Sequence, residues 1–369
     1  MKEFLEVKKR FGFGCMRLPM IEGNVDIEQV KKMVDLFLEK GFNYFDTAHG
    51  YIGGQSELAL KECLTSRYPR DKYILTNKLS DNFFQSEEDI DRVFSDQLNA
   101  CGVDYFDFYL MHAQNRNNFQ KYKRCHAYEH ALELLKQGKI RHFGISFHDT
   151  AEILDQILTE YPQIEVVQIQ YNYLDYDDEG IQSKLCYEVC VKHDKRVIIM
   201  EPIKGGSLIN LDDKALQLIK DHDLTPARLA VRFAASPKNV FMVLSGMSAI
   251  EQMEENVSFM ENFVPINEEE FALTREIVDY VRSIPLIGCT ACRYCVDGCP
   301  QHILIPDLFS WYNAKVKFNG WQMHQFKNIA KEEGHGGPGD CIRCGKCENA
   351  CPQHLPIREL LKNISKDFK

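Results

Sequence analysis

Short apolar runs alternate with amphipathic stretches along residues 1–282 of the chain. The runs are rich in aromatic and β-branched residues, which are typical of buried strands. They occur at residues 11–18, 42–45, 73–76, 105–111, 140–146, 166–170, 196–200 and 240–244. Helical periodicity predicts helices at residues 26–40, 55–66, 86–101, 123–137, 150–160, 179–193, 213–222, 225–236 and 249–262.

This order of strands and helices is typical of a closed (β/α)8 barrel, which needs about 250 residues. An open, doubly wound sheet is the alternative, and a dinucleotide-binding sheet carries G-x-G-x-x-G after an early strand. Here Gly12 and Gly14 have no third glycine at the required position. The sequence therefore predicts an α/β fold with a TIM barrel, whose catalytic groups lie at the carboxyl ends of the strands.

Cysteines recur with one spacing, C-x-x-C-x-x-C-x-x-x-C-P, in two places near the C-terminal end of the sequence. This is the ligand run of bacterial 4Fe–4S sites, in which the fourth cysteine binds the other cluster of a pair. Zinc and disulfides are the alternatives, but zinc sites usually close with two C-x-x-C pairs. We therefore predict two 4Fe–4S clusters with crossed ligand sets. The first set is Cys289, Cys292, Cys295 and Cys351, and the second is Cys341, Cys344, Cys347 and Cys299.

A short linker at residues 283–288, with a proline and a glycine, separates the two patterns. We expect a barrel domain at residues 1–282 and a cluster domain at residues 283–369. The segment between the cysteine runs is too long and too helical for a compact β-hairpin ferredoxin, and residues 357–368 read as a closing helix. Trp311 and Trp321 are expected to pack in a core or an interface.

Composition is that of an ordinary globular protein, with 44% hydrophobic and 27% charged residues and a formal net charge of −10. No basic patch is dense enough to indicate nucleic-acid binding. No apolar run is long enough for a membrane helix, and residues 1–14 lack the apolar core of a secretory signal. The cysteines outside the two runs show no pairing pattern, which favours a reducing cytoplasm.

Polar residues follow three successive predicted strands. They are Asp46 and, shortly after it, Tyr51, then Lys78 and His112. Taken singly, each has a structural interpretation, such as a turn, a surface charge or a buried histidine. Together they fit the reduction of a carbonyl by hydride: a lysine favours the phenolate, a carboxylate holds the lysine, and a neutral histidine orients the carbonyl.

The runs FGFGCMRLP, FDTAHGYIGGQSE, DYFDFYLMH, GKIRHFGIS, VVQIQYN and VLSGMSAIEQMEEN resemble the aldo-keto reductase superfamily. The barrel followed by two cysteine runs resembles its subgroup with an α-helical ferredoxin domain. The resemblance implies Tyr51 as general acid, Lys78 and Asp46 as the residues that tune it, and His112 as the residue that orients the carbonyl. It also implies NAD(H) or NADP(H) at the barrel mouth. The matching positions are Gly14, Met16, Arg17, Ser146, Gln168, Met200, Pro202, Gly206, Ser245, Gly246, Gln252 and Asn256.

Several positions depart from the family pattern. Met200 replaces an aromatic residue that stacks on the nicotinamide in many relatives, and Phe147 replaces the usual asparagine after Ser146. Gly246 and Gln252 stand where NADPH-selective relatives have Lys and Arg. Charge-assisted bonds to a 2′-phosphate would be lost there, at roughly 1.5–3 kcal/mol each, so we expect a preference for NADH over NADPH, or weak nicotinamide binding.

The resulting hypothesis is a cytoplasmic oxidoreductase that acts on a small carbonyl or alcohol. Its clusters would exchange electrons with an external ferredoxin or flavoprotein carrier. Two alternatives are a reductase with purely structural clusters and an electron-transfer subunit that uses the barrel as a cofactor sensor or docking scaffold. Loops at residues 113–122 and 171–180 are expected to shape the substrate pocket.

Overall fold

The computed structural model of the chain describes residues 3–318 and 334–367. It divides into two compact units. One contains residues 1–205 and 227–272, and the other contains residues 206–226 and 273–369. In the part of the chain that is described, no helix is long and apolar enough to cross a membrane.

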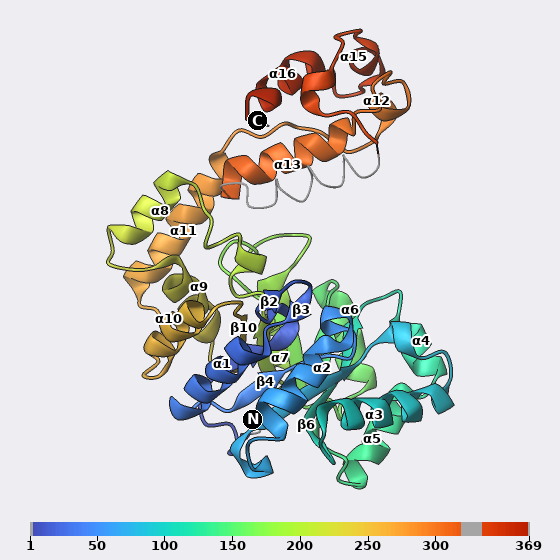
Figure 1. Cartoon of the computed structure of the whole chain (residues 1–369), viewed down its shortest axis with the longest axis vertical. Coiled ribbons are helices and arrows are strands. Elements are labelled where there is room, and N and C mark those ends of the chain that lie inside the picture. Colours follow the sequence, from blue (N-terminus) through green and yellow to red (C-terminus); the bar gives the residue numbers. More distant parts are fainter. Residues whose placement is uncertain (1–2, 319–333, 368–369) are drawn as a thin grey trace. The chain divides into compact units, whose positions relative to one another are not determined.

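The first unit is built on a closed barrel of parallel strands, in the order β1-β10-β9-β8-β7-β6-β5-β4. Figure 1 shows strands of this barrel among the helices of the same unit. The strands are almost entirely buried, because the barrel interior covers one face and the surrounding helices cover the other. Their bounds are β1 Phe11–Gly14, β4 Tyr44–Asp46, β5 Ile74–Leu79, β6 Phe106–Gln114, β7 Ile140–Phe147, β8 Val166–Gln170, β9 Arg196–Met200 and β10 Val240–Gly246. The predicted barrel is confirmed.

Helices alternate with the strands along the chain. Their starts are set by local chemistry: Asp26 accepts a hydrogen bond from the Gln29 amide, and Ser86 forms a capping box with Asp89. The helices are α1 Ile27–Glu39, α2 Gln55–Leu60, α3 Glu87–Cys101, α4 Phe119–Arg124, α5 Ala127–Lys136, α6 Ala151–Glu160, α7 Ser183–Lys192, α8 Asp213–Lys220, α9 Pro226–Ala235, α10 Ile250–Met260 and α11 Glu268–Ser283.

Three features differ from the elements expected from the sequence. The single helix expected at 123–137 is divided into α4 and α5, because His126 has a left-handed backbone with φ 50°. Helix α11 was not expected at all. A small hairpin, β2 Met20–Ile21 and β3 Asn24–Val25, follows the first strand.

The second unit holds α8, most of α11 and the cysteine-rich segment, with helices α12 Tyr294–Asp297, α13 Ile305–Phe318, α15 Lys346–Ala350 and α16 Ile357–Asp367. Helices α13 and α16 form a small apolar core, because Phe309, Leu361 and Ile364 are almost fully buried between them. The expected closing helix is therefore present as α16. Trp311 packs against this core, as expected, whereas Trp321 lies outside the described residues.

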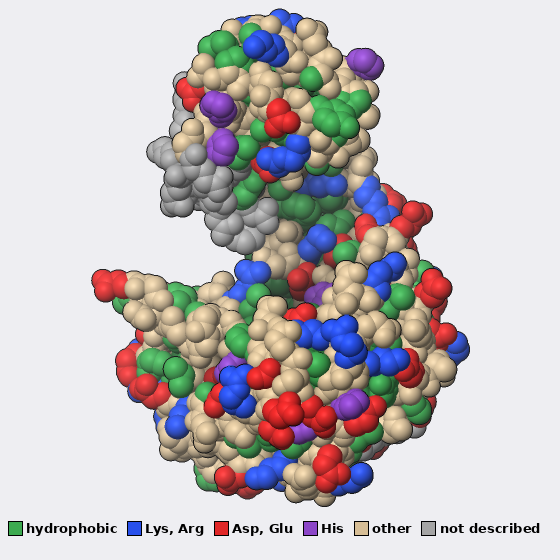
Figure 2. Space-filling view, turned by 90° about the vertical axis from the view of Figure 1, so that its right-hand side faces the viewer, with side chains coloured by type: hydrophobic (Ala, Val, Ile, Leu, Met, Phe, Trp, Pro, Cys, Tyr) green, Lys and Arg blue, Asp and Glu red, His purple; other side chains and the backbone are tan. Residues whose placement is uncertain are grey.

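Charged side chains of both signs share the surface. On the face shown in Figure 2, Lys and Arg residues are interspersed with Asp and Glu residues. Many pair with each other, as Arg67 does with Asp35 and Arg116 with Asp149. Such exposed pairs stabilise the fold by at most about 1 kcal/mol each, so the barrel depends mainly on its apolar core.

Candidate active site and cysteine cavities

Four of the predicted polar residues lie at the carboxyl-terminal end of neighbouring strands. Asp46 ends β4, Lys78 lies near the end of β5, and His112 lies in β6. Tyr51 opens a short 3-10 turn, Tyr51–Gly54, directly after β4. Parallel strand order brings their side chains to one rim, which is where a barrel places its catalytic groups.

Lys78 is the centre of this group and is fully buried. Its Nζ donates to Asp46 Oδ1 at 2.5 Å, to the Thr47 carbonyl at 2.8 Å and to the Tyr51 hydroxyl at 3.3 Å. The ammonium therefore joins the carboxylate to the phenol. A buried ammonium is tolerated only with such partners, because an unpaired one would lose its hydration without compensation.

Burial and neighbouring charged groups shift the pKa values of Lys78 and Tyr51 in opposite directions. Burial lowers the pKa of Lys78, but the adjacent Asp46 and Tyr51 outweigh it, so the ammonium form is favoured. Burial raises the pKa of Tyr51, and the lysine charge lowers it by a smaller amount. The net pKa of the phenol is therefore above its usual value, although Lys78 acts on it in the expected direction. The phenol holds its proton at neutral pH, as a proton donor must.

His112 is neutral at physiological pH. Burial, followed by the charges of Lys78 and His148, lowers its pKa to about 3. Its Nδ1 lies 2.5 Å from the Ser80 hydroxyl, which fixes the ring and leaves Nε2 for a substrate oxygen. Ser80 was not predicted from the sequence. The only feature that could have indicated its role is its position two residues after Lys78.

A buried polar network behind Lys78 was also missed. Gln97 Nε2 donates to the Lys78 carbonyl at 2.8 Å, and the Lys78 amide donates to Asn77 Oδ1 at 2.8 Å. Asn77 donates to Glu57 at 2.8 Å, and Glu57 lies 2.8 Å from His49 Nδ1. The network fixes the backbone that carries the lysine. Only the polar character of these residues in otherwise apolar segments could have indicated it.

Several of the positions expected to bind the nicotinamide cofactor cluster at the ends of β1 and β10. Gly14 pairs with Gly246 in register, and the Arg17 side chain packs on Gly246. Asn256 Nδ2 donates to Ser245 Oγ at 3.3 Å. Met16 and Gln252 are exposed, and Gln252 Oε1 accepts from the Ser248 amide at 2.8 Å.

The remaining cofactor positions lie at the ends of β7, β8 and β9, with one exception. Ser146 and Gln168 are neighbours across β7 and β8, and Ser146 Oγ accepts from the Ala113 amide at 2.7 Å. Gln168 is 3% exposed, and its Oε1 has no hydrogen-bond partner within the described chain. Such an atom is costly to bury unless a ligand donates to it. Met200 ends β9 and Pro202 follows it, whereas Gly206 falls in the second compact unit.

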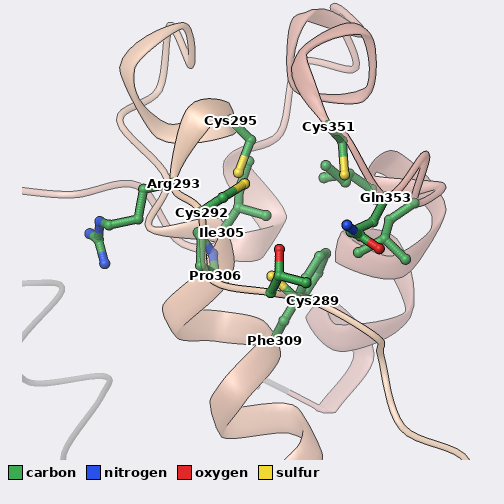
Figure 3. A pocket seen from close by; sticks show the side chains of 12 residues that line it. Cys289, Cys292, Arg293, Cys295, Ile305, Pro306, Phe309, Cys351 and Gln353 are labelled. Atoms are coloured by element: carbon green, nitrogen blue, oxygen red, sulfur yellow. The ribbon is translucent and has the colours of Figure 1, made fainter.

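The cysteines of the two runs divide into two sets within the second unit. One cavity of about 320 Å³ is lined by Cys289, Cys292, Cys295 and Cys351, together with apolar residues of α13 (Figure 3). Cys292 and Cys295 lie together on one side of this cavity, and Cys351 lies on the other (Figure 3). A second cavity of about 320 Å³ is lined by Cys299, Cys341, Cys344 and Cys347. Each cavity thus draws three cysteines from one run and the last cysteine of the other.

These donor sets fit iron–sulfur clusters, since four thiols surround each space, and apolar side chains together with a few polar and basic ones line the rest. No three His, Cys, Asp or Glu side chains of the described residues are arranged to hold a single metal ion. Cys292 and Cys344 are exposed, so each cavity has one edge at the surface.

Comparison with known proteins gives two family matches. Residues 10–279 match the aldo/keto reductase family, and residues 288–355 match a 4Fe-4S dicluster domain. Among curated relatives, the NADH-specific methylglyoxal reductase of Escherichia coli is 24% identical over 73% of this chain and 94% of its own length. The L-galactose dehydrogenase of Arabidopsis thaliana is 25% identical over 74% and 89%.

Solved structures of aldo-keto reductases share the fold of the barrel unit. An aldo-keto reductase from Bacillus halodurans in its holo form superposes with a TM-score of 0.60 at 25% identity, covering 73% of this chain and 92% of that one. A Klebsiella pneumoniae aldo-keto reductase in complex with NADPH gives 0.59 at 20% identity, over 74% and 96%. The chain therefore belongs to the aldo/keto reductase family, with a 4Fe-4S dicluster domain following the barrel.

Proposed function

We propose that this NAD(P)H-dependent reductase converts a small carbonyl compound to the alcohol, or the reverse, with Tyr51 as the acid. The observation that carries the proposal is the buried Lys78 ammonium, which bonds both Asp46 and the Tyr51 hydroxyl. Residues 1–282 form the catalytic domain in this proposal, and residues 283–369 form the cluster domain.

The side chains then have distinct roles. The nicotinamide supplies the hydride when it is bound. Tyr51 gives its hydroxyl proton to the carbonyl oxygen, and the Lys78 ammonium stabilises the phenolate that remains. Asp46 keeps Lys78 charged and in place, and neutral His112 donates a hydrogen bond that orients the carbonyl. Alcohol oxidation uses the same groups in reverse.

The cofactor is held by the residues at the ends of β1, β7, β8 and β10. The unpartnered Gln168 Oε1 and the Ser146 hydroxyl suit an amide group, and Gly14 and Gly246 lie side by side at the ends of β1 and β10. We propose NADH over NADPH, because Gly246 and Gln252 offer no cation for a 2′-phosphate. Titration of both cofactors by intrinsic fluorescence tests this, and tighter binding of NADPH would contradict it.

The dicluster match implies two Fe–S clusters, and we propose the crossed ligand sets that line the two cavities. An external ferredoxin or flavoprotein is the proposed carrier, supported by the surface position of Cys292 and Cys344. Loss of carrier-dependent turnover in Cys344→Ser, with NADH-dependent turnover retained, supports this role. Equal loss of both activities would favour structural clusters.

The main experiment replaces Tyr51 by Phe. Carbonyl reduction should fall by about 10²–10⁴, the usual contribution of a general acid, while the iron–sulfur absorbance stays unchanged. Tyr68→Phe is the matched control, because it removes a phenolic hydroxyl that bonds Asp35 at the surface. Full activity in Tyr51→Phe would refute the assignment of the acid.

A further inference from the structure

Three polar side chains at successive strand ends are not used by the proposed chemistry. His148 follows β7, Gln170 ends β8, and Glu201 follows β9. These strands are neighbours in the barrel, so the three residues lie in a row on the carboxyl-terminal rim. Gln170 Nε2 donates to Glu201 Oε2 at 3.2 Å. Gln170 also shares a side-chain hydrogen bond with His148.

This row lies beside the active site. His148 follows Phe147, which pairs in register with Gln114 of β6, two residues after His112. The His148 amide also donates to the Gln114 carbonyl at 2.9 Å, on the strand that carries His112. A substrate whose carbonyl reaches His112 could therefore extend toward His148.

Glu201 is held in an unusual backbone conformation. Its φ is 54°, a left-handed value that is uncommon for residues other than glycine. Its carbonyl accepts from the Lys204 amide at 3.0 Å and from Asn172 Nδ2 at 3.2 Å. Asn172 is fully buried and bonds Asp175, whose carboxylate is paired with Lys204 Nζ. These contacts hold the backbone of Glu201 in this conformation.

A cavity adjoins the row. This pocket is open to solvent and is lined by Phe147, His148, Asp149, Ile169, Gln170, Gly180, Ile181 and Cys186. The Asp149 carboxylate is already paired with Arg116, to which it bonds through both oxygens. His148 and Gln170 thus supply uncharged polar groups to the cavity, and Ile169 and Ile181 supply apolar surface.

We propose that His148, Gln170 and Glu201 form a specificity site for the hydroxyl-bearing end of the carbonyl substrate. A hydroxyl both donates and accepts, so it can donate to the Glu201 carboxylate and accept from the imidazole or the amide. Two hydroxyls on adjacent carbons would span neighbouring members of the row. The inference rests on the proposed function and names its substrate class, a hydroxylated aldehyde or ketone.

The test compares glyceraldehyde with propanal, which lacks both hydroxyls, using the anaerobically purified full chain with saturating NADH. A site built to bond hydroxyl groups discriminates strongly against an analogue without them, so kcat/KM for glyceraldehyde should exceed that for propanal by at least about 100-fold. Glu201→Ala should reduce this ratio by at least about 10-fold, mostly through KM for glyceraldehyde, because a bond to a charged group is lost. Activity on propanal and the Kd for NADH should stay within about twofold.

Controls separate the possible outcomes. Glu188→Ala removes an exposed carboxylate from the middle of α7 and should leave the ratio unchanged. Glu201→Gly removes the same carboxylate while relieving the left-handed backbone, so it tests the proposal even if the alanine variant folds poorly. The site assignment would be overturned if the glyceraldehyde-to-propanal ratio of kcat/KM stayed unchanged in these Glu201 variants, or if the variants bound NADH more weakly. A preference of the wild type for aminoacetaldehyde over glyceraldehyde would overturn it as well. Failure of the wild type to reduce either aldehyde would overturn the proposed function as well.

Discussion

Lys78 shows how a buried charge can serve both stability and chemistry. It is fully buried, and its partners Asp46 and Tyr51 raise its pKa against the effect of burial. Replacing it by Met leaves the Asp46 carboxylate buried without its cation. We expect Lys78→Met to destabilise the protein by about 3–5 kcal/mol in urea unfolding and to reduce turnover by at least about 10².

The double variant Asp46→Leu/Lys78→Met separates the two effects. It removes both charges and replaces them with apolar groups, so much of the lost stability should return while turnover stays low. If activity returned with stability, Lys78 would matter only for folding, and the proposed role in stabilising the phenolate would be wrong.

His49 gives a prediction that depends on pH. Its hydrogen bond to the buried Glu57 raises its pKa above 6.5, against the opposing effect of partial burial. The folded state therefore binds the proton more tightly than the unfolded state. This stabilisation is complete below the unfolded pKa near 6.5 and is lost as the pH rises through the higher folded pKa.

The variant His49→Gln measures this contribution. Compared with the wild type, it should be less stable by about 1 kcal/mol at pH 5.5, and the difference should shrink by pH 9. Urea unfolding at both pH values checks this. A difference that grows with pH would show that the charged form of His49 is not what Glu57 stabilises.

At the level of elements, close packing between strands gives a sharp test at Gly144 in β7. A Cβ there would lie 2.4 Å from Val166 Cγ2 and 2.5 Å from the Val166 carbonyl oxygen on β8. Because one obstacle is backbone, Gly144→Ala should destabilise the barrel by about 3 kcal/mol. The control is Gly138→Ala, at φ 71° with no atom within 4 Å, which should cost about 1 kcal/mol. Equal midpoints in urea would contradict the packing argument.

The same elements show what the sequence could predict. Each barrel strand is an apolar run buried on both faces, so the number of strands and their order along the chain follow from the hydrophobic pattern. The break between α4 and α5 at His126 could not be predicted, because the helical periodicity of residues 123–137 continues through it. Ser80 and the network of Glu57, Asn77 and Gln97 were also missed, since these polar residues meet only after the strands have assembled.

On the scale of the whole molecule, the cysteine-rich unit differs from the barrel in what holds it together. The apolar core around the cysteines is small, with residues mainly of α13 and α16, and the thiols line two cavities rather than bonding one another. Small domains of this kind usually need metal to be stable. Because each cavity takes one cysteine from the other run, loss of one cluster should affect both runs.

Paired cysteine substitutions test the crossed arrangement. Cys292 and Cys351 line the same cavity, so Cys292→Ser/Cys351→Ser should damage one cluster and leave about four irons per chain. Cys344 and Cys351 line different cavities, so Cys344→Ser/Cys351→Ser should damage both and leave fewer. If each run bound its own cluster, the results would be reversed: Cys292→Ser/Cys351→Ser would damage both clusters, and Cys344→Ser/Cys351→Ser would damage only one. Iron analysis and electron paramagnetic resonance of the dithionite-reduced protein distinguish them, with Cys125→Ser, a barrel cysteine, as the control.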